Sequence, residues 1–204
     1  MSRTARERYT AHGVRLLGMT HPRIRALKRD HTPSVHGHKP WTSSFLMMDY
    51  LERFPIGKRA RVMEIGCGWG PVSVFCAKRF DARVTGVDID RDVFPYLRAL
   101  AAENEVRIRT VRSPFERLTT RRLGRQDVIV GSDICFWDEL VDPLFNLIRR
   151  ASRGGAKRFV LADPGRSPFR ALTERCEASF ATQVWEWNTG RPEKFEGEIL
   201  DIVF

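Results

Sequence analysis

The residues most able to do chemistry surround three closely spaced glycines. A short apolar run, 62–65, carries Glu64 and leads into the sequence Gly-Cys-Gly-Trp-Gly at 66–70. This pattern is typical of a buried strand that passes through a glycine turn into a helix. Glycines let the backbone turn sharply and approach a ligand, whose polar groups then meet N–H groups at the helix start. Pro71 suits the first helical turn, because its missing donor costs nothing there. We therefore predict a ligand-binding loop.

The spacing of the glycines indicates which ligand this loop binds. Dinucleotide-binding folds use Gly-x-Gly-x-x-Gly, whereas the third glycine here comes one residue early, at Gly70. A second predicted strand, 82–88, ends in Asp88, 18 residues after Gly70. A carboxylate in that place accepts hydrogen bonds from a ribose diol and repels a 2′-phosphate. The loop and Asp88 together predict a nucleoside site.

The rest of the chain supplies a scaffold for this site. Apolar segments of strand length alternate with amphipathic segments of helix length from residue 59 onward, which predicts βαβ units and a parallel sheet. We expect an α/β fold with a mostly parallel seven-stranded sheet and helices on both faces. The predicted strands are 60–65, 82–88, 106–111, 127–133, 158–162, 182–188 and 197–204. Helices are predicted over 70–80, 91–103 and 168–180. Another is predicted from Trp137 to Arg153, with Trp137 on its buried face. A further helix is predicted after a cap at 42–44, with Met47, Tyr50, Leu51 and Phe54 in the core.

The end of the fourth predicted strand carries the leading catalytic candidate. Ligands of open α/β sheets bind outside the carboxyl ends of the strands, where the strand order reverses. Asp133 ends the strand 127–133 at that place, and Phe136 and Trp137 follow it. A strand-end aspartate can also cap the next helix, with Phe136 in the core, and the pattern leaves this alternative open.

A turn follows the fifth predicted strand. The sequence Asp-Pro-Gly-Arg at 163–166 suits a type II turn. Arg166 could also grip an acidic substrate or hold Asp163 in place. The residues themselves do not decide between these roles.

These motifs resemble those of the class I (seven-β-strand) S-adenosylmethionine (SAM)-dependent methyltransferases. Residues 64–70 look like the first motif of that family, and Asp88 looks like its ribose-binding acid. The resemblance implies a Rossmann-like fold and SAM as the cofactor, with no metal. In the family, the loop after the third strand lies beside the adenine, and the sequence at 113–116 also fits a capping box. The implied cofactor contacts are Trp41, Glu64, Gly66, Cys67, Gly68, Trp69, Gly70, Asp88, Ile89, Ser113, Pro114, Phe115 and Ser132.

The segment around Asp133 points to an acceptor. Methyltransferases of planar amines carry Asn/Asp-Pro-Pro-Tyr/Phe here, and both prolines are missing. Asp133-x-x-Phe136 instead resembles the family 16 protein-lysine methyltransferases, and 163–166 looks like the branch that acts on the electron-transfer flavoprotein β subunit. Residues 41–43 resemble the Trp-Pro segment of that family, with threonine in place of proline. The resemblance implies lysine methylation of a protein, with Asp133, Phe136 and Trp137 as catalytic residues and Asp163 and Arg166 as substrate contacts.

Lysine chemistry is consistent with these residue types. A lysine amine has a pKa of about 10.4 and is nucleophilic only when neutral, so a site must release its proton and aim its lone pair. Asp133 could orient the amine, while Phe136 and Trp137 form an aromatic wall that tolerates a cation. Methylation of RNA or a small amine, or SAM binding without turnover, are the alternatives.

The charge of the chain is concentrated near its start. Residues 1–40 carry nine Lys/Arg and two acids, which is +7 of a total of +10 in 204 residues. We predict a basic helical arm over 1–40 and one methyltransferase domain over 41–204. The arm could attract nucleic acid or an acidic protein, although a solvated surface is the commoner explanation, and nucleic acid is not favoured. His36 and His38 lack further ligands nearby, so no metal site is predicted there.

Composition also bounds location and assembly. No apolar run approaches the ~18 residues of a membrane span, and the start lacks the apolar part of a secretory signal. The four cysteines form no Cys-x-x-Cys pair, which indicates reduced thiols. We expect a cytoplasmic monomer or weak dimer, with an organelle matrix as the alternative because the start is rich in arginine.

Overall fold

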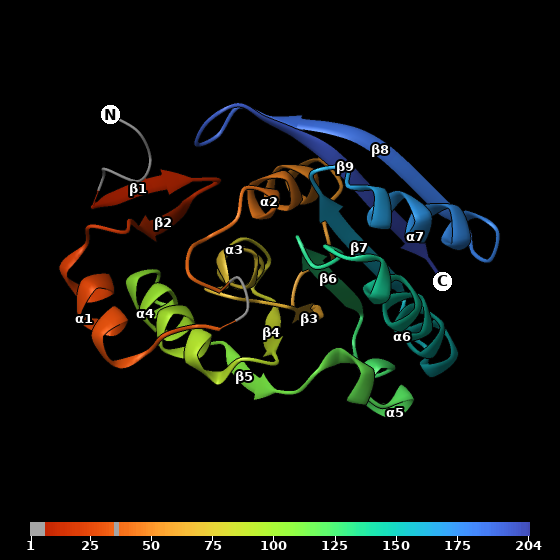
Figure 1. The fold of residues 1–204 in the computed structure, drawn as a ribbon, viewed down its shortest axis with the longest axis horizontal. Coiled ribbons are helices and arrows are strands. Elements are labelled where there is room, and N and C mark those ends of the chain that lie inside the picture. Colours follow the sequence, from red (N-terminus) through yellow and green to blue (C-terminus); the bar gives the residue numbers. More distant parts are fainter. Residues whose placement is uncertain (1–6, 35–36) are drawn as a thin grey trace.

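A seven-stranded sheet forms the centre of the molecule (Figure 1). The structure is a computed structural model that describes residues 7–34 and 37–204; Arg3, Arg6 and His36 of the predicted arm lie outside them. The strand order is β5-β4-β3-β6-β7-β9-β8, and only the pairs that involve β9 are antiparallel. The predicted mostly parallel seven-stranded sheet is confirmed. Its strands are β3 (Arg61–Ile65), β4 (Arg83–Asp88), β5 (Arg109–Arg112), β6 (Val128–Ser132), β7 (Arg158–Asp163), β8 (Thr182–Thr189) and β9 (Phe195–Val203).

Helices cover both faces of the sheet, as predicted. Val62, Val130 and Val160 point to one face, where they share a core with α2 (Ser43–Arg53), α3 (Pro71–Phe80) and α4 (Phe94–Glu103). Their neighbours Met63 and Ile129 point to the other face and pack with α6 (Val141–Gly154) and α7 (Ser167–Glu177). Central strands buried on both faces explain the near-continuous apolar runs of the sequence. The short helix α5 (Thr120–Leu123) packs beside α6.

The N-terminal segment differs from the predicted helical arm. Residues 8–17 form a hairpin of β1 (Arg8–Ala11) and β2 (Val14–Leu17), and α1 (Pro22–Asp30) is the one helix among the described residues of this segment. The two turn residues, His12 and Gly13, have φ of 49° and 75°, the backbone twist that two-residue hairpins require. Apolar residues of the hairpin and α1 are buried in the same core as α3 and α4, so this segment is packed against the domain.

Smaller predictions also fail for local reasons. The predicted capping box at 113–116 is absent, because Ser113 donates to the Pro114 carbonyl and 115–117 form a 3-10 turn. The side chain of Thr42 makes no capping bond to α2. Phe54 is 37% exposed and stacks on Trp185 at the surface, so it lies outside the core. Further 3-10 turns span Arg91–Val93 and Asp138–Leu140, which delays the start of α6 to Val141.

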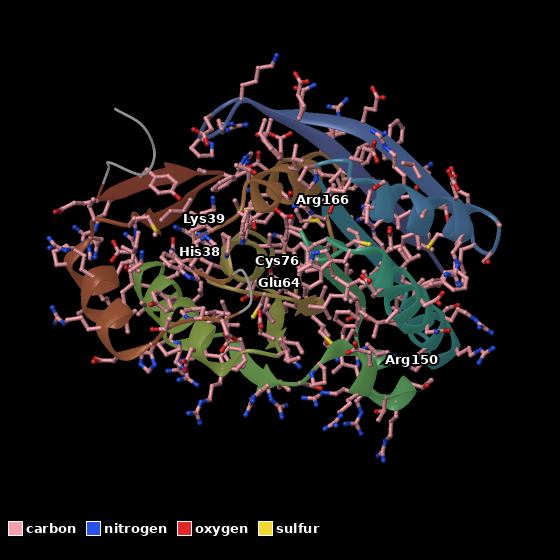
Figure 2. The ribbon with its side chains drawn as sticks, in the orientation of Figure 1. His38, Lys39, Glu64, Cys76, Arg150 and Arg166 are labelled. Carbon is pink, nitrogen blue, oxygen red and sulfur yellow. The ribbon has the colours of Figure 1, made fainter. Side chains whose placement is uncertain are left out.

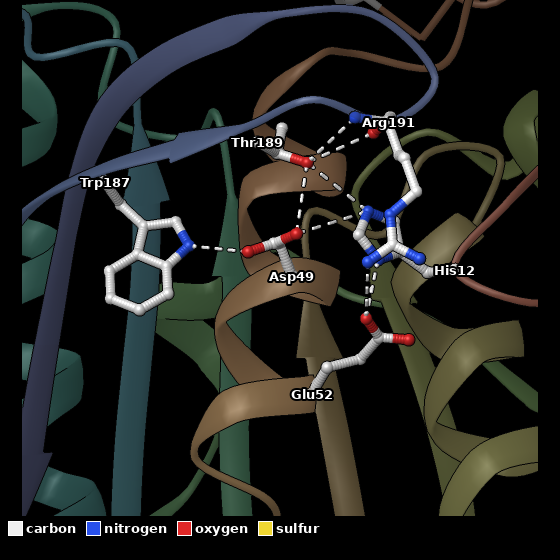
Figure 3. A network of polar contacts seen from close by, with 6 residues as sticks. All are labelled: His12, Asp49, Glu52, Trp187, Thr189 and Arg191. Atoms are coloured by element: carbon white, nitrogen blue, oxygen red, sulfur yellow. Dashed lines mark hydrogen bonds and ion pairs between the residues drawn. The ribbon is translucent and has the colours of Figure 1, made fainter.

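A polar network joins the first and last parts of the chain (Figure 3). The His12 ring is fully buried, with Nδ1 3.2 Å from Glu52 Oε2 and Nε2 3.9 Å from Asp49 Oδ1. Asp49 also accepts from Trp187 at 3.1 Å and from Thr189 at 3.3 Å. One atom each of His12, Asp49 and Glu52 lies within 4.8 Å of the others, a spacing that could hold a cation. Both ring nitrogens already face carboxylates, so the imidazole acts here as a bridge between elements.

No helix among residues 7–34 and 37–204 combines the length and the apolar character needed to cross a bilayer. This finding agrees with the hydropathy of the sequence.

We expect His12→Ala to lower the free energy of unfolding by about 1–3 kcal/mol, because it leaves carboxylates on α2 without their buried partner. Urea unfolding followed by circular dichroism measures this loss. His31→Ala is the matched control: the His31 ring is 34% exposed, and its loss should cost about 0.5 kcal/mol or less. Equal losses in the two variants would contradict a bridging role for His12.

Candidate active site

The predicted site residues meet where the order of the strands reverses. β3 and β6 are neighbours in the sheet, although β4 and β5 lie between them in the chain. Their carboxyl ends open onto a pocket of about 330 Å³. This is the place at which open α/β sheets bind ligands. The pocket is lined by Gly37, Trp41, Gly66, Gly68, Val87, Asp88, Ile89, Ser113, Pro114, Phe115, Glu116, Ser132, Asp133, Ile134, Phe136, Trp137 and Leu140.

The three glycines of the loop have different reasons to be glycine. All three adopt positive φ, from 49° to 70°, which side chains rarely tolerate. A Cβ on Gly66 would meet Ile134, and one on Gly70 would lie 2.7 Å from Leu97. A Cβ on Gly68 would meet no atom within 4 Å, and Gly68 lines the pocket. Gly68 therefore keeps space open for a ligand, whereas Gly66 and Gly70 allow the loop to pack.

Asp88 stands at the end of β4 beside this loop. Its carboxylate accepts from Gly68 N at 2.9 Å and from Asp90 N at 3.0 Å. Burial raises the pKa of Asp88 above its ordinary value, and the backbone hydrogen bonds oppose that rise. A carboxylate has about four acceptor sites, so Asp88 keeps acceptor capacity for the hydroxyl groups of a ligand.

Four of the predicted cofactor contacts lie behind the pocket wall. Glu64 is buried, and it accepts hydrogen bonds from both N (2.9 Å) and Oγ of Ser73 at the start of α3. Burial raises the pKa of Glu64 to about 8. Figure 2 shows Glu64 and Cys76 together in the interior. Glu64 thus ties β3 to the helix that follows the loop. The others behind the wall are Cys67, Trp69 and Gly70.

Trp69 supports the opposite wall of the pocket. Its indole is buried, donates to the Gly37 carbonyl at 2.7 Å and stacks on Tyr96 with ring centroids 4.6 Å apart. Gly37 itself lines the pocket, together with Trp41 from the same segment. Lys39 Nζ lies 4.5 Å from the Trp41 ring centroid, and Figure 2 shows Lys39 on the loop ahead of α2. The segment before α2 therefore closes one side of the pocket.

The end of β6 holds two features that cost free energy. Ser132 Oγ is buried and has no hydrogen-bond partner among the described residues. An unsatisfied buried hydroxyl costs about 1–3 kcal/mol. Asp133 adopts φ of 61°, a left-handed conformation that costs about 1–2 kcal/mol for a residue with a Cβ. Such costs cluster at functional sites.

Arg166 joins the two acidic residues at the ends of β6 and β7. Its guanidinium donates to Asp133 Oδ1 and, at 2.9 Å, to Asp163 Oδ2. Asp133 also accepts from Ser43 at 3.3 Å, and both carboxylates are almost fully buried. Burial raises the pKa of Asp163 to about 6. Arg166 therefore holds Asp163, which was one of the two roles expected from the sequence, and it also holds Asp133. Its guanidinium lies 5.5 Å from the Phe136 ring centroid.

A second hollow, of about 610 Å³, adjoins the pocket on its outer side. The two share Phe136 and Trp137, whose ring centroids are 5.6 Å apart. Trp137 is 53% exposed, so the prediction that it lies on the buried face of the next helix is wrong. The outer hollow is lined by Phe136, Trp137, Asp138, Glu139, Arg166, Ser167 and Pro168.

Sequence reasoning missed several lining residues: Gly37, Val87, Glu116, Ile134 and Leu140. Val87 and Ile134 adjoin predicted site residues, so extending each motif by one residue would have found them. Nothing in the sequence indicates that Gly37 reaches the glycine loop.

Comparisons with known proteins agree with this geometry. A family model described as a methyltransferase domain matches residues 62–155. The electron transfer flavoprotein beta subunit lysine methyltransferase of Xenopus laevis is 28% identical over 146 residues, which are 69% of this chain and 58% of that protein. A putative protein N5-glutamine methyltransferase of Methanocaldococcus jannaschii is 28% identical over 187 residues, 86% of this chain and 88% of the relative. A methyltransferase structure from Pyrococcus furiosus superposes with a TM-score of 0.63 at 18% identity, over 89% of this chain and 95% of that one.

Residues 62–155 match a methyltransferase domain, and the structure has the fold of a methyltransferase. The match to the frog enzyme spans just over half of that enzyme's length. Three observations indicate that SAM fits this pocket. Gly68 leaves space for a ligand, the Asp88 carboxylate can accept further hydrogen bonds, and Ser132 Oγ has no hydrogen-bond partner among the described residues.

We expect Gly68→Ala to weaken SAM binding about tenfold or more, which is about 1.4 kcal/mol, because the new Cβ enters the pocket. Isothermal titration with SAM measures the affinity. Gly13→Ala is the matched control, since Gly13 has φ of 75° and an equally open Cβ position, but lies in the hairpin turn. An unchanged affinity of the Gly68 variant would contradict its place in the site.

We expect Glu64→Gln to remove a pH dependence of stability. The pKa of Glu64 rises from an ordinary 4.5 to about 8 on folding. The folded state thus keeps a proton that the unfolded state releases, so Glu64 lowers the free energy of unfolding as pH rises through this window. Between pH 5 and pH 8 the variant should gain at least about 1.4 kcal/mol relative to the parent, the equivalent of one pKa unit. Urea unfolding at both pH values measures the gain, and a constant difference between the proteins would contradict the raised pKa.

Proposed function

We propose that this protein transfers a methyl group from SAM to a lysine amine of another protein. The observation that carries the proposal is the outer hollow, where Asp138 and Glu139 stand beside the exposed ring of Trp137. Acidic and aromatic groups together favour the approach of a cationic side chain. The hollow shares Phe136 and Trp137 with the pocket, which Asp133 also lines. The frog relative, by its name, acts on lysine, which supports the same acceptor.

The proposed SAM contacts are the predicted residues that line the pocket. Gly68 and Asp88 would hold the nucleoside, and Ser132 Oγ offers an unpaired hydroxyl. Glu64 and Trp69 do not line the pocket and would support it indirectly. Glu64 would fix the glycine loop through Ser73, and Trp69 would fix Gly37. When bound, SAM supplies a methyl group that is already activated for transfer. The other proposed contacts are Trp41, Gly66, Ile89, Ser113, Pro114 and Phe115.

At the acceptor end, Asp133 would orient the amine. Its carboxylate is fixed by Arg166 on one oxygen and by Ser43 on the other, so its direction is set before the acceptor arrives. Such preorganisation lowers the barrier by aligning the lone pair with the transferred carbon. Phe136 and Trp137 would exclude water from the acceptor, since both line the pocket as well as the outer hollow. Asp163 acts through Arg166, which it holds at 2.9 Å.

A glutamine amide is the second candidate acceptor. The archaeal relative, whose name gives a glutamine acceptor, aligns with most of both chains. The two acceptors differ in their protons: a lysine ammonium must lose one before attack, so its methylation accelerates as pH rises towards about 10.4, whereas an amide has no such requirement.

The remaining proposals concern setting and assembly. We propose a cytoplasmic protein that acts as a monomer or weak dimer, with a flavoprotein subunit as one class of acceptor. Radiolabel transfer from SAM into a cell extract, followed by mass spectrometry of labelled proteins, tests the function. Label on lysine supports the proposal. Label on glutamine, in RNA or in small molecules, or SAM binding without transfer, contradicts it.

We expect Asp88→Ala and Asp133→Ala to separate binding from transfer. Loss of the Asp88 carboxylate should lower SAM affinity about tenfold or more. Loss of the Asp133 carboxylate should leave SAM affinity within about threefold but reduce transfer about 100-fold or more, because the acceptor is no longer aimed. Titration with SAM and label transfer measure the two effects, and Asp133→Asn, which preserves shape, guards against misfolding. Equal losses of SAM affinity in both variants would contradict the assigned roles.

A further inference from the structure

A large hollow lies at the end of the sheet opposite the SAM pocket. Its volume is about 920 Å³, and it opens beside the amino ends of β3, β4 and β5. Nothing in the proposed transfer reaction uses this end of the sheet. Its charged lining residues are Arg59, Arg61, Arg83, Arg107, Arg109, Arg125 and Asp81.

Strand register sets two of these arginines side by side. Arg61 on β3 is the direct partner of Arg83 on β4. Arg109 begins β5 and pairs with Thr85, two residues after Arg83, and Arg107 lies just before that strand. Neighbouring strands are about 4.8 Å apart, so the arginines at these strand starts lie close together. Like charges directly opposite one another on neighbouring strands are destabilising.

Most of this charge is not neutralised. Arg59 pairs with Asp81 at 3.2 Å, and Arg61 pairs with Asp127 at 3.1 Å. Within the described ranges, 7–34 and 37–204, no ion pair involves the other four arginines of the hollow: Arg83, Arg107, Arg109 and Arg125. All four are exposed. Six guanidinium groups line the hollow against the single carboxylate of Asp81, and Asp127 outside it is shared between Arg61 and Lys157.

The composition of the hollow indicates what binds there. Interfaces between proteins have an apolar centre with aromatic residues, whereas the large exposed apolar side chains among the described residues all lie elsewhere. Ala82 and Val84, which also line the hollow, are buried. Arginine presents a planar fork that matches phosphate oxygens in pairs. Several guanidinium groups in one open groove match a ligand that carries regularly spaced phosphate groups.

We propose that this arginine groove binds the phosphate backbone of a nucleic acid. The groove and the SAM pocket lie at opposite ends of the same strands, so the bound strand is a docking partner and not the methyl acceptor. This site is independent of the proposed lysine methylation. It lies at the amino ends of β3, β4 and β5, and not in the basic segment 1–40. Association with nucleic acid would bring the enzyme to acceptor proteins that are themselves carried on it.

The test is fluorescence anisotropy with labelled 20-nucleotide RNA, 20-nucleotide DNA and a 20-base-pair duplex, each over a salt series. The variant Arg83→Gln/Arg107→Gln removes two unpaired charges from the groove. Arg149→Gln/Arg153→Gln on α6 removes two exposed charges that do not line the groove and is the matched control. Isothermal titration with SAM confirms that both variants keep an intact pocket.

We expect the groove variant to bind at least about tenfold more weakly and its salt slope to fall by about 1.4–1.8, the value for two lost phosphate contacts. The control should change neither by a comparable amount. The three probes show whether RNA, single-stranded DNA or duplex is preferred. Equal losses in both variants, or no binding by the parent, would overturn the proposal. Poly-glutamate that binds the groove as tightly would assign it to an acidic protein instead and also overturn it.

Discussion

The pairing of β3 with β6 is the constraint on which the site depends. These strands lie side by side in the sheet, and the helices that follow them pack on opposite faces, α3 on one and α6 on the other. The chain must therefore diverge at their carboxyl ends, which leaves a crevice that no helix fills. Gly68 and Ser132 reach that crevice from different halves of the sequence because their strands are hydrogen-bonded neighbours.

The acidic side chains at the ends of β6 and β7 are bound by one arginine in the protein itself, without a ligand. Asp133 and Asp163 are almost fully buried, and a single guanidinium serves both. Breaking such an arrangement by removing one member is costly, because the partner is left as an uncompensated buried charge. The orientation of Asp133 is thus a property of β6, β7 and the turn at 163–166 together.

The sequence contained most of the information for the sheet and less for its surroundings. Alternating apolar and amphipathic segments predicted all seven strands, because burial on both faces leaves a clear pattern in β3, β6 and β7. The glycine loop and Asp88 were predictable because their function demands particular residue types at particular spacings. The hairpin of β1 and β2 was not predictable, because strands of four residues are too short to show a clear alternation of apolar and polar residues. Arg166 was found from its motif, but its contact with Asp133 depends on tertiary packing that no spacing reveals.

The wall made by Gly37 and Trp41 lies before the segment that matches the methyltransferase family model, and Arg166 lies after it. The matched region, 62–155, thus supplies Gly68, Asp88 and Asp133, while the flanks supply Trp41 to the pocket and Arg166 to Asp133. A change in either flank can therefore alter the pocket wall or the direction of the Asp133 carboxylate while the core sequence stays the same. An alignment limited to the core carries little information about what each such protein modifies.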